Sequence, residues 1–253
     1  MSSYPPTPPE YPPSPPAPPR VIRRPVMNPP YVTYILIASC VLVYLLQMAT
    51  PLSSGSDLIT LWGAKINSQI VTGQYWRLLT PMWLHGSLLH IAFNMYALYI
   101  FGRNLEPAYG HGRFLLLYIL SGYAGNVISF LMSPNASVGS STAIFGLIAA
   151  QGVFLYQNRH LIRNAQAMML NTVMIIIINL VLGFSPGIDN WGHMGGLIGG
   201  LAFAWSAGPL WNVQADINGL QLVNQRSAGR VIMVALGVAV VFTVLVVFRI
   251  QTY

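Results

Sequence analysis

Seven long apolar runs determine the fold class of this chain. They cover residues 31–50, 83–102, 113–133, 141–157, 168–184, 190–208 and 231–248. Most are close to the roughly 20 residues that a helix needs to cross the hydrocarbon core of a bilayer. The runs are continuous rather than alternating, which favours helices over strands, and a helix satisfies its own backbone hydrogen bonds in lipid. We therefore expect an all-α polytopic membrane protein, with a six-helix core and a seventh C-terminal transmembrane helix.

The composition excludes the other broad classes. Only 7% of the residues are charged, against about 25% in an ordinary soluble domain. The net charge of +7 comes from residues scattered singly between apolar runs, so no basic face predicts a nucleic-acid partner and membrane lipid is the expected environment. Cys40 is the single cysteine, which excludes a disulfide framework and a cysteine-based metal site.

Proline and charge divide the chain into segments. Residues 1–30 hold 13 of the 19 prolines, and we expect a disordered, proline-rich cytoplasmic tail there. Residues 31–208 are the predicted six-helix core, 209–230 a cytoplasmic linker, and 231–253 the seventh transmembrane helix with the C-terminus.

Basic residues predict the orientation in the membrane. With a cytoplasmic N-terminus, nine basic residues lie inside and three lie outside. The inner ones are Arg20, Arg23, Arg24, Arg103, Arg113, Arg159, Arg163, Arg226 and Arg230, and the outer ones are Lys65, Arg77 and Arg249. We expect a multi-pass protein of the plasma membrane whose long loop 51–82 faces outward.

Four of the polar residues inside the predicted spans are candidates for function, because an uncompensated polar group there costs several kcal/mol. His90 and Asn94 share one face of the run 83–102, Ser141 begins the run 141–157, and His193 lies near the start of 190–208. These three helices run in the same direction, so we expect the four side chains at one depth near the outer surface. Serine and histidine at one depth predict a nucleophile and its general base.

The acidic residues do not complete a triad. Asp189 is the acid nearest to His193 in the sequence, but it lies four residues upstream in a loop. We therefore expect a catalytic dyad of Ser141 and His193.

Donors for a developing oxyanion are also present. The backbone N–H of Ser141 is free at a helix start, where the helix dipole is positive. His90 and Asn94 add side-chain donors, and Gly139 lets the chain turn just before the nucleophile.

Three further residues are expected to support the pair. Phe145, one turn after Ser141, is placed to stack on the imidazole of His193. Gly196 and Gly200 lie on the face of His193 and allow close helix packing.

Other polar residues receive structural predictions. His85 is expected to be an interior histidine outside the active site, and Arg103 is expected to form an interfacial ion pair with Glu106. A metal site of His85, His90 and His193 has no HExxH motif and no acidic ligand to support it. We predict neither a metal nor a cofactor. A transporter would show internal repeats and broken helices in paired halves, which are not seen.

At these residues the sequence resembles the rhomboid family of intramembrane serine proteases. The resemblance runs from about residue 75 to 205 and comprises YWRLLTPMWLH, HIAFNMYALYIFGRNLE, FLLLYILSGYAGN, VGSSTAIFGL and WGHMGGLIGGL, in family order. It implies a rhomboid-like six-helix core, with Ser141 as nucleophile, His193 as general base, and Asn94, His90 and the Ser141 N–H around the oxyanion. It also implies that Trp76 and Arg77 belong to a structural loop that dips into the membrane.

The resemblance also implies the class of substrate, and the sequence differs from the family pattern at one position of the site. The expected partners are transmembrane protein substrates, cleaved in or near a membrane-spanning segment. Thr142 stands where the family usually has glycine. A β-branched residue restricts the backbone beside the oxyanion site, so we expect slower turnover or altered substrate choice. The alternative prediction is an inactive rhomboid-like protein that binds membrane clients.

Overall fold

The computed structural model describes residues 22–23, 29–53, 55–216 and 219–253. Most of the predicted proline-rich tail lies outside the described residues. The helices and strands are, in order, β1 (Ile22–Arg23), α1 (Tyr31–Ala49), α2 (Leu58–Gly63), α3 (Asn67–Val71), the 3-10 helices η1 (Tyr75–Leu78) and η2 (Thr80–Trp83), α4 (Leu88–Tyr109), α5 (His111–Met132), α6 (Ser141–Gln157), α7 (Ala165–Leu182), α8 (Asn190–Ala207), β2 (Trp211–Asp216), β3 (Gly219–Asn224) and α9 (Ala228–Gln251).

Within the described residues, seven long helices form the body of the protein, which confirms the predicted all-α polytopic fold. By length and composition, α1, α5, α7 and α9 are long and apolar enough to cross a membrane. The other three, α4, α6 and α8, carry the polar residues singled out above. The second predicted span is the one most displaced, because residues 80–83 form η2 and α4 begins only at Leu88 and continues to Tyr109.

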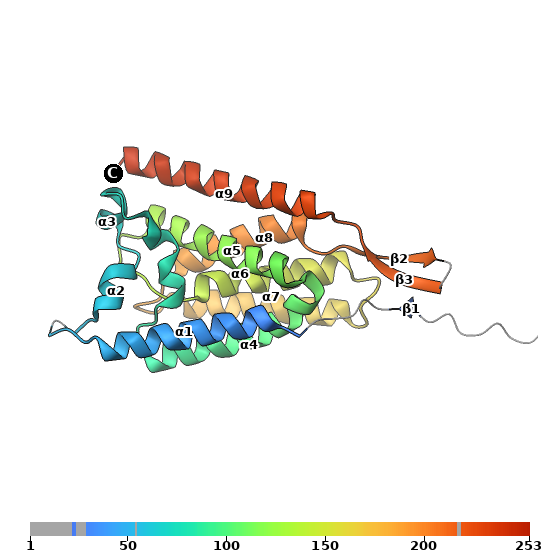
Figure 1. The fold of residues 1–253 in the computed structure, drawn as a ribbon, viewed down its shortest axis with the longest axis horizontal. Coiled ribbons are helices and arrows are strands. Elements are labelled where there is room, and N and C mark those ends of the chain that lie inside the picture. Colours follow the sequence, from blue (N-terminus) through green and yellow to red (C-terminus); the bar gives the residue numbers. More distant parts are fainter. Residues whose placement is uncertain (1–21, 24–28, 54, 217–218) are drawn as a thin grey trace, which may run out of the picture.

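Helix α6 lies at the centre of the molecule (Figure 1), and eleven of its 17 residues are buried. It packs on α4, α5, α7 and α8, while α1 packs on α4, and α9 lies against α5 and α8. Small residues allow the closest approach, because a Cβ on Gly200 would overlap the Cα of Gly146, and one on Gly196 would overlap the carbonyl oxygen of Thr142. The backbones of α6 and α8 are therefore in direct contact.

The segment between α1 and α4 forms a compact cap at one end of the helices (Figure 1). Arg77 is buried and donates to the carbonyl oxygens of Ala64 and Leu61, at 2.8 and 2.9 Å. Trp76 stacks on Trp62 with the ring centroids 5.4 Å apart. Both residues therefore hold the cap together.

The segment 209–230, expected only as a linker, contains an antiparallel hairpin at the opposite end of the molecule (Figure 1). Strands β2 and β3 pair from Trp211↔Asn224 to Asp216↔Gly219, and β1 adds a parallel pairing at Ile22↔Leu220. The alternation of polar and apolar residues in WNVQAD and GLQLVN is the signal that sequence reasoning missed.

The predicted ion pair between Arg103 and Glu106 is wrong. Glu106 is fully buried and accepts hydrogen bonds from the backbone N–H groups of Val32 and Thr33, at 2.8 and 2.7 Å. Its carboxylate also contacts His111. Arg103 is exposed and instead donates to the hydroxyl of Tyr99. Glu106 therefore fixes the start of α1, because free N–H groups and the positive end of a helix dipole attract a carboxylate.

Candidate active site

A cavity of about 700 Å³ lies where the N-terminal ends of α4, α6 and α8 meet. All four polar residues predicted to share one depth line this cavity: His90, Asn94, Ser141 and His193. The other walls come from the loop 133–138, from residues 186–189 before α8, and from Thr60 and Ala64 of the cap. Three parallel helices thus bring residues that are distant in the sequence to one place.

Ser141 and His193 form a direct contact. The Oγ of Ser141 lies 3.0 Å from the Nε2 of His193, which is hydrogen-bond distance for a nucleophile and its base. Ser141 is the first residue of α6, so its backbone N–H is one of those left free at a helix start. His193 is 8% exposed and lines the cavity.

The ring of Phe145 lies flat against the ring of His193. The two centroids are 4.2 Å apart and the planes differ by 14°. A stacked aromatic ring restricts the imidazole to one rotamer and keeps its Nε2 directed at Ser141.

Asp189 does not contact the imidazole and instead organises the start of α8. Its Oδ1 accepts from the backbone N–H of Gly192 at 2.9 Å, and its Oδ2 accepts from the hydroxyl of Ser129 on α5. Among the described residues, the Nδ1 of His193 has no hydrogen-bond partner. The arrangement is therefore a serine–histidine pair whose acid neighbour acts as a helix cap.

His90 and Gly139 meet at the edge of the cavity. The Nδ1 of His90 accepts a long hydrogen bond from the N–H of Gly86, at 3.4 Å, and this assigns the proton of the neutral ring to Nε2. Gly139 has φ of 129°, and a Cβ there would lie 2.8 Å from His90 Nε2. A glycine is therefore required at this position for both conformation and space.

Asn94 lies one turn further along α4. Its amide donates to the carbonyl oxygen of His90 at 3.1 Å, and it has one more N–H to offer to the cavity. Asn94 is 7% exposed and lines the cavity.

The neighbouring serine, Ser140, points in a different direction. It is fully buried, and its Oγ lies 3.4 Å from the Nε2 of His85. Gln47 of α1 holds the backbone of His85 at both its N–H and its carbonyl oxygen. Burial, and secondly electrostatic repulsion between the protonated forms of His85 and His90, lower the pKa of His85 to about 4. His85 is thus a neutral interior histidine at pH 7, and its ring contacts that of His90 edge-on at 5.2 Å.

Thr142 is accommodated by glycines on two neighbouring helices. Its side chain is buried, and a Cβ on Gly125 of α5 would lie 2.5 Å from the Cβ of Thr142. A Cβ on Gly192 of α8 would lie 3.0 Å from its methyl group. The side chain of Thr142 therefore fills a space between α5 and α8.

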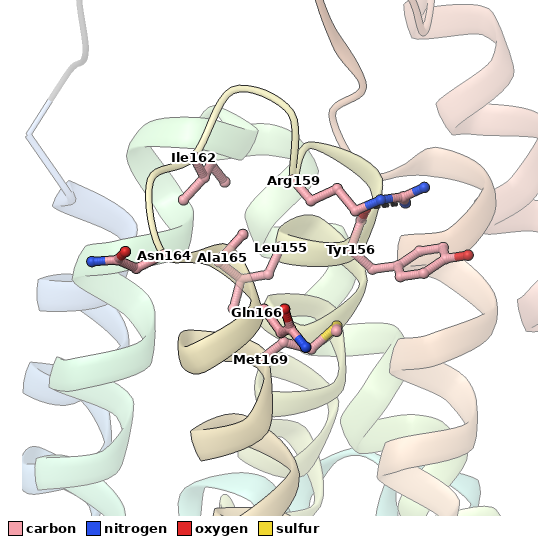
Figure 2. A pocket seen from close by; sticks show the side chains of 8 residues that line it. All are labelled: Leu155, Tyr156, Arg159, Ile162, Asn164, Ala165, Gln166 and Met169. Carbon is pink, nitrogen blue, oxygen red and sulfur yellow. Dashed lines mark hydrogen bonds between the residues drawn. The ribbon is translucent and has the colours of Figure 1, made fainter.

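A second cavity, of about 480 Å³, lies near the ends of α6 and α7 that face away from the site (Figure 2). Its polar side chains do not converge. The guanidinium of Arg159 lies over the ring of Tyr156, 4.6 Å from its centroid, and Asn164 points to the other side. The structure forms no nucleophile–base pair in this cavity.

Within the described part of the chain, no three His, Cys, Asp or Glu side chains converge as metal ligands would. Lys65 does not line the cavity, but its ammonium binds the loop 133–135 that does, and the sequence predicted it only as an external charge. It is the one lysine of the chain, and that singularity was the available signal.

The part of this chain that matches known proteins contains the predicted site residues. A family model described as "Rhomboid domain" matches residues 72–209, more than half of the chain. Rhomboid protease GluP of Bacillus subtilis (strain 168) is 43% identical over 180 residues, covering 71% of this chain and 35% of that protein. RHOMBOID-like protein 9, chloroplastic, of Arabidopsis thaliana is 36% identical over 186 residues, covering 71% and 43%.

A third relative, RHOMBOID-like protein 6, mitochondrial, of Arabidopsis thaliana, is 36% identical over 156 residues, covering 61% of this chain and 51% of that protein. The matched part of the chain thus spans between 35% and 51% of the length of these three relatives. The family model covers α4 to α8 and all of the residues that the sequence predicted for the site. This chain is an integral membrane protein and belongs to the rhomboid family.

Proposed function

We propose that this chain is an intramembrane serine endopeptidase that hydrolyses peptide bonds in or beside transmembrane segments of other membrane proteins. The observation that carries the proposal is the 3.0 Å contact between Ser141 Oγ and His193 Nε2 at the wall of the cavity. The similarity to a relative named as a protease supports it.

In the proposed reaction, the Oγ of Ser141 attacks the carbonyl carbon of the scissile peptide while His193 Nε2 takes the hydroxyl proton. The amine then leaves with that proton, and an acyl-enzyme ester remains on Ser141. Water attacks the ester while His193 accepts a proton from it, and His193 then returns that proton to the Oγ of Ser141 as the carboxylic acid product is released. The stacked ring of Phe145 stabilises the imidazolium formed in each half-reaction.

The negative charge on the carbonyl oxygen needs donors that are already in place. The proposed donors are the backbone N–H of Ser141, the Nε2–H of His90 and the free amide N–H of Asn94. The hydrogen bond from Gly86 to His90 supports this role, because it leaves the proton of the neutral ring on the nitrogen near Gly139.

The proposed substrates are transmembrane helices that unwind locally, because a fully hydrogen-bonded helix hides its scissile carbonyl. We place the protein in the plasma membrane with its N-terminus in the cytoplasm and the cavity toward the outer face. The excess of basic residues at the end opposite the cavity supports that orientation. Accessibility of an N-terminal tag to protease, in sealed vesicles before and after permeabilisation, tests it.

The test of the proposed activity is cleavage of a tagged single-pass reporter in proteoliposomes, with a chelator present. Wild type is expected to cut, and Ser141→Ala and His193→Ala are each expected to lose at least about 10³-fold in rate. Ser140→Ala is the matched control, because Ser140 faces His85, and it is expected to retain cleavage.

Cleavage by Ser141→Ala would contradict the proposal. If wild type cuts no reporter, a fluorophosphonate probe decides between the two candidate functions. Labelling of Ser141 supports an active protease that does not cut the chosen reporter. Failure to label supports the alternative of an inactive client-binding protein, which the departure at Thr142 raised.

A further inference from the structure

Lys65 connects the cap to the segment that leads into Ser141. It is fully buried, and its ammonium donates to the carbonyl oxygens of Ser133 and Asn135, at 2.9 and 2.7 Å. Its backbone pairs in both directions with Ser137, at 3.0 and 3.1 Å. One residue therefore holds the chain at three points between α5 and α6.

The held segment forms part of the active-site cavity. Residues 133 and 135–138 line that cavity, and the chain then passes through Gly139 and Ser140 to Ser141. A displacement of this segment would move the start of α6, where the free backbone N–H of Ser141 lies.

The charge of Lys65 contributes to this contact. The ammonium lies at the C-terminal end of α5, where the helix dipole favours a cation. Asp189, which caps α8, is the charged neighbour that favours the protonated amine. Arg77 of η1 holds the preceding residue through the carbonyl oxygen of Ala64.

Burial of this amine works against the stability of the fold. Desolvation lowers the pKa of Lys65 to about 8 from an ordinary 10.5, with Asp189 partly opposing the shift. The unfolded chain therefore holds the proton more tightly than the folded chain. Between about pH 8 and pH 10.5, a rise in pH stabilises the fold through this group.

We propose that Lys65 is a positioning residue for the reaction, and that its charged ammonium holds residues 133–137 in the arrangement that aims Ser141. This inference rests on the proposed protease function. Loss of the charge is expected to lower activity while leaving or raising stability, because holding the loop and stabilising the fold have opposite pH dependences at this residue.

The first readout is the pH profile of reporter cleavage in proteoliposomes. Wild type is expected to lose activity as pH rises through about 8, the pKa of Lys65, without a parallel fall in its thermal midpoint. Lys65→Arg stays charged throughout, so its alkaline limb is expected to disappear. Lys65→Met is expected to lower kcat about tenfold or more at pH 7, by analogy with other losses of alignment.

The matched control is Asn67→Ala. Asn67 also binds the start of this segment, at the carbonyl oxygen of Ser133, together with that of Phe130 in α5, but it does not titrate. Its loss is expected to lower the thermal midpoint and to leave the alkaline limb in place. An alkaline limb unchanged by Lys65→Arg, or a wild-type kcat in Lys65→Met, overturns the inference.

The second readout requires no activity. Amide hydrogen exchange of residues 133–140 in the wild-type protein, corrected for the intrinsic pH dependence, is expected to quicken between pH 7 and 9.5 while exchange in α7 does not. Constant protection of 133–140 overturns the role of Lys65 even if the variants do not fold. A reporter cut by Ser141→Ala would instead overturn the proposed protease and leave this readout standing.

Discussion

At the scale of single residues, the site depends on a histidine held without a carboxylate. The carboxylate of Asp189 binds Gly192 and Ser129, and the ring of His193 is fixed by Phe145 instead. Orientation and charge stabilisation, which an acid supplies in a triad, therefore fall to an aromatic face.

This division of roles leads to a prediction for Asp189→Asn. Asparagine keeps the oxygen that caps α8, so kcat for the reporter is expected to stay within about tenfold of wild type, whereas the same change in a true triad costs about 10⁴-fold. Steady-state cleavage kinetics measure the difference. A drop as deep as that of His193→Ala would show that Asp189 acts on the imidazole after all.

The residues of the site could be anticipated from the sequence because their positions follow from helix geometry. Ser141, His193, His90 and Asn94 each lie near the start of a helix running in the same direction, so topology alone places them at one depth. Lys65 could not be found in this way. Its partners are backbone carbonyls of a loop, and no pattern in the sequence marks which carbonyls a loop presents.

The sequence predicts that Thr142 acts by restricting the backbone beside the oxyanion site. In the structure, the buried side chain of Thr142 packs between two neighbouring helices. Its bulk is matched by Gly125 and Gly192 on two other helices. The side chain of Thr142 lies between α5 and α8, and the backbone N–H of Ser141 remains free. Slower turnover or altered substrate choice because of Thr142 stays a prediction.

At the scale of helices and strands, polar anchors decide where each helix begins. Glu106 holds the first turn of α1, and Asp189 holds the first turn of α8. In a bilayer, where lipid is as apolar as leucine, such contacts position helices that the hydrophobic effect alone would not place.

Glu106→Gln tests this anchoring. The amide keeps one acceptor but turns an N–H donor toward the backbone N–H of either Val32 or Thr33, so a loss of about 1.5–3 kcal/mol in stability is expected. The thermal midpoint in detergent measures it. Arg103→Gln is the control. Equal losses of stability from the two substitutions would indicate that Arg103 and Glu106 form an ion pair and would contradict the anchoring role of Glu106.

The existence of the seven long helices was readable from the sequence, whereas the starts of some were not. Hydropathy reports which residues enter the membrane, but caps and 3-10 turns decide where hydrogen bonding begins. The predicted run 83–102 therefore corresponds to the last residue of η2, a short link and most of α4. The hairpin of β2 and β3 was not predicted, because the charge and length of residues 209–230 indicated only a linker and the alternating pattern of its two strands is short.

At the scale of the whole molecule, α9 is an addition to a core that already contains the site. Its buried residues form one stripe, which consists of Val231, Ala235, Val238, Phe242 and Val246. They face α5 and α8, and none of them lines the cavity.

A chain ending after Ser227 is accordingly expected to remain active. In a bilayer, lipid replaces α9 against α5 at little cost, so the rate of reporter cleavage is expected to stay within about threefold of wild type. In detergent, the thermal midpoint is expected to fall. Loss of fluorophosphonate labelling by the shortened chain in bilayers would show that α9 belongs to the working core.

The enclosure of α6 has a consequence for how the protein is made. Ser141 begins α6, whereas His193 arrives with α8, 52 residues later. While the chain is being synthesised, the serine enters the membrane well before its base, and the central helix has no complete set of neighbours until α8 is inserted. A nascent chain therefore carries no assembled Ser141–His193 pair, and its neighbours at the site of insertion are not exposed to that pair until the core is nearly finished.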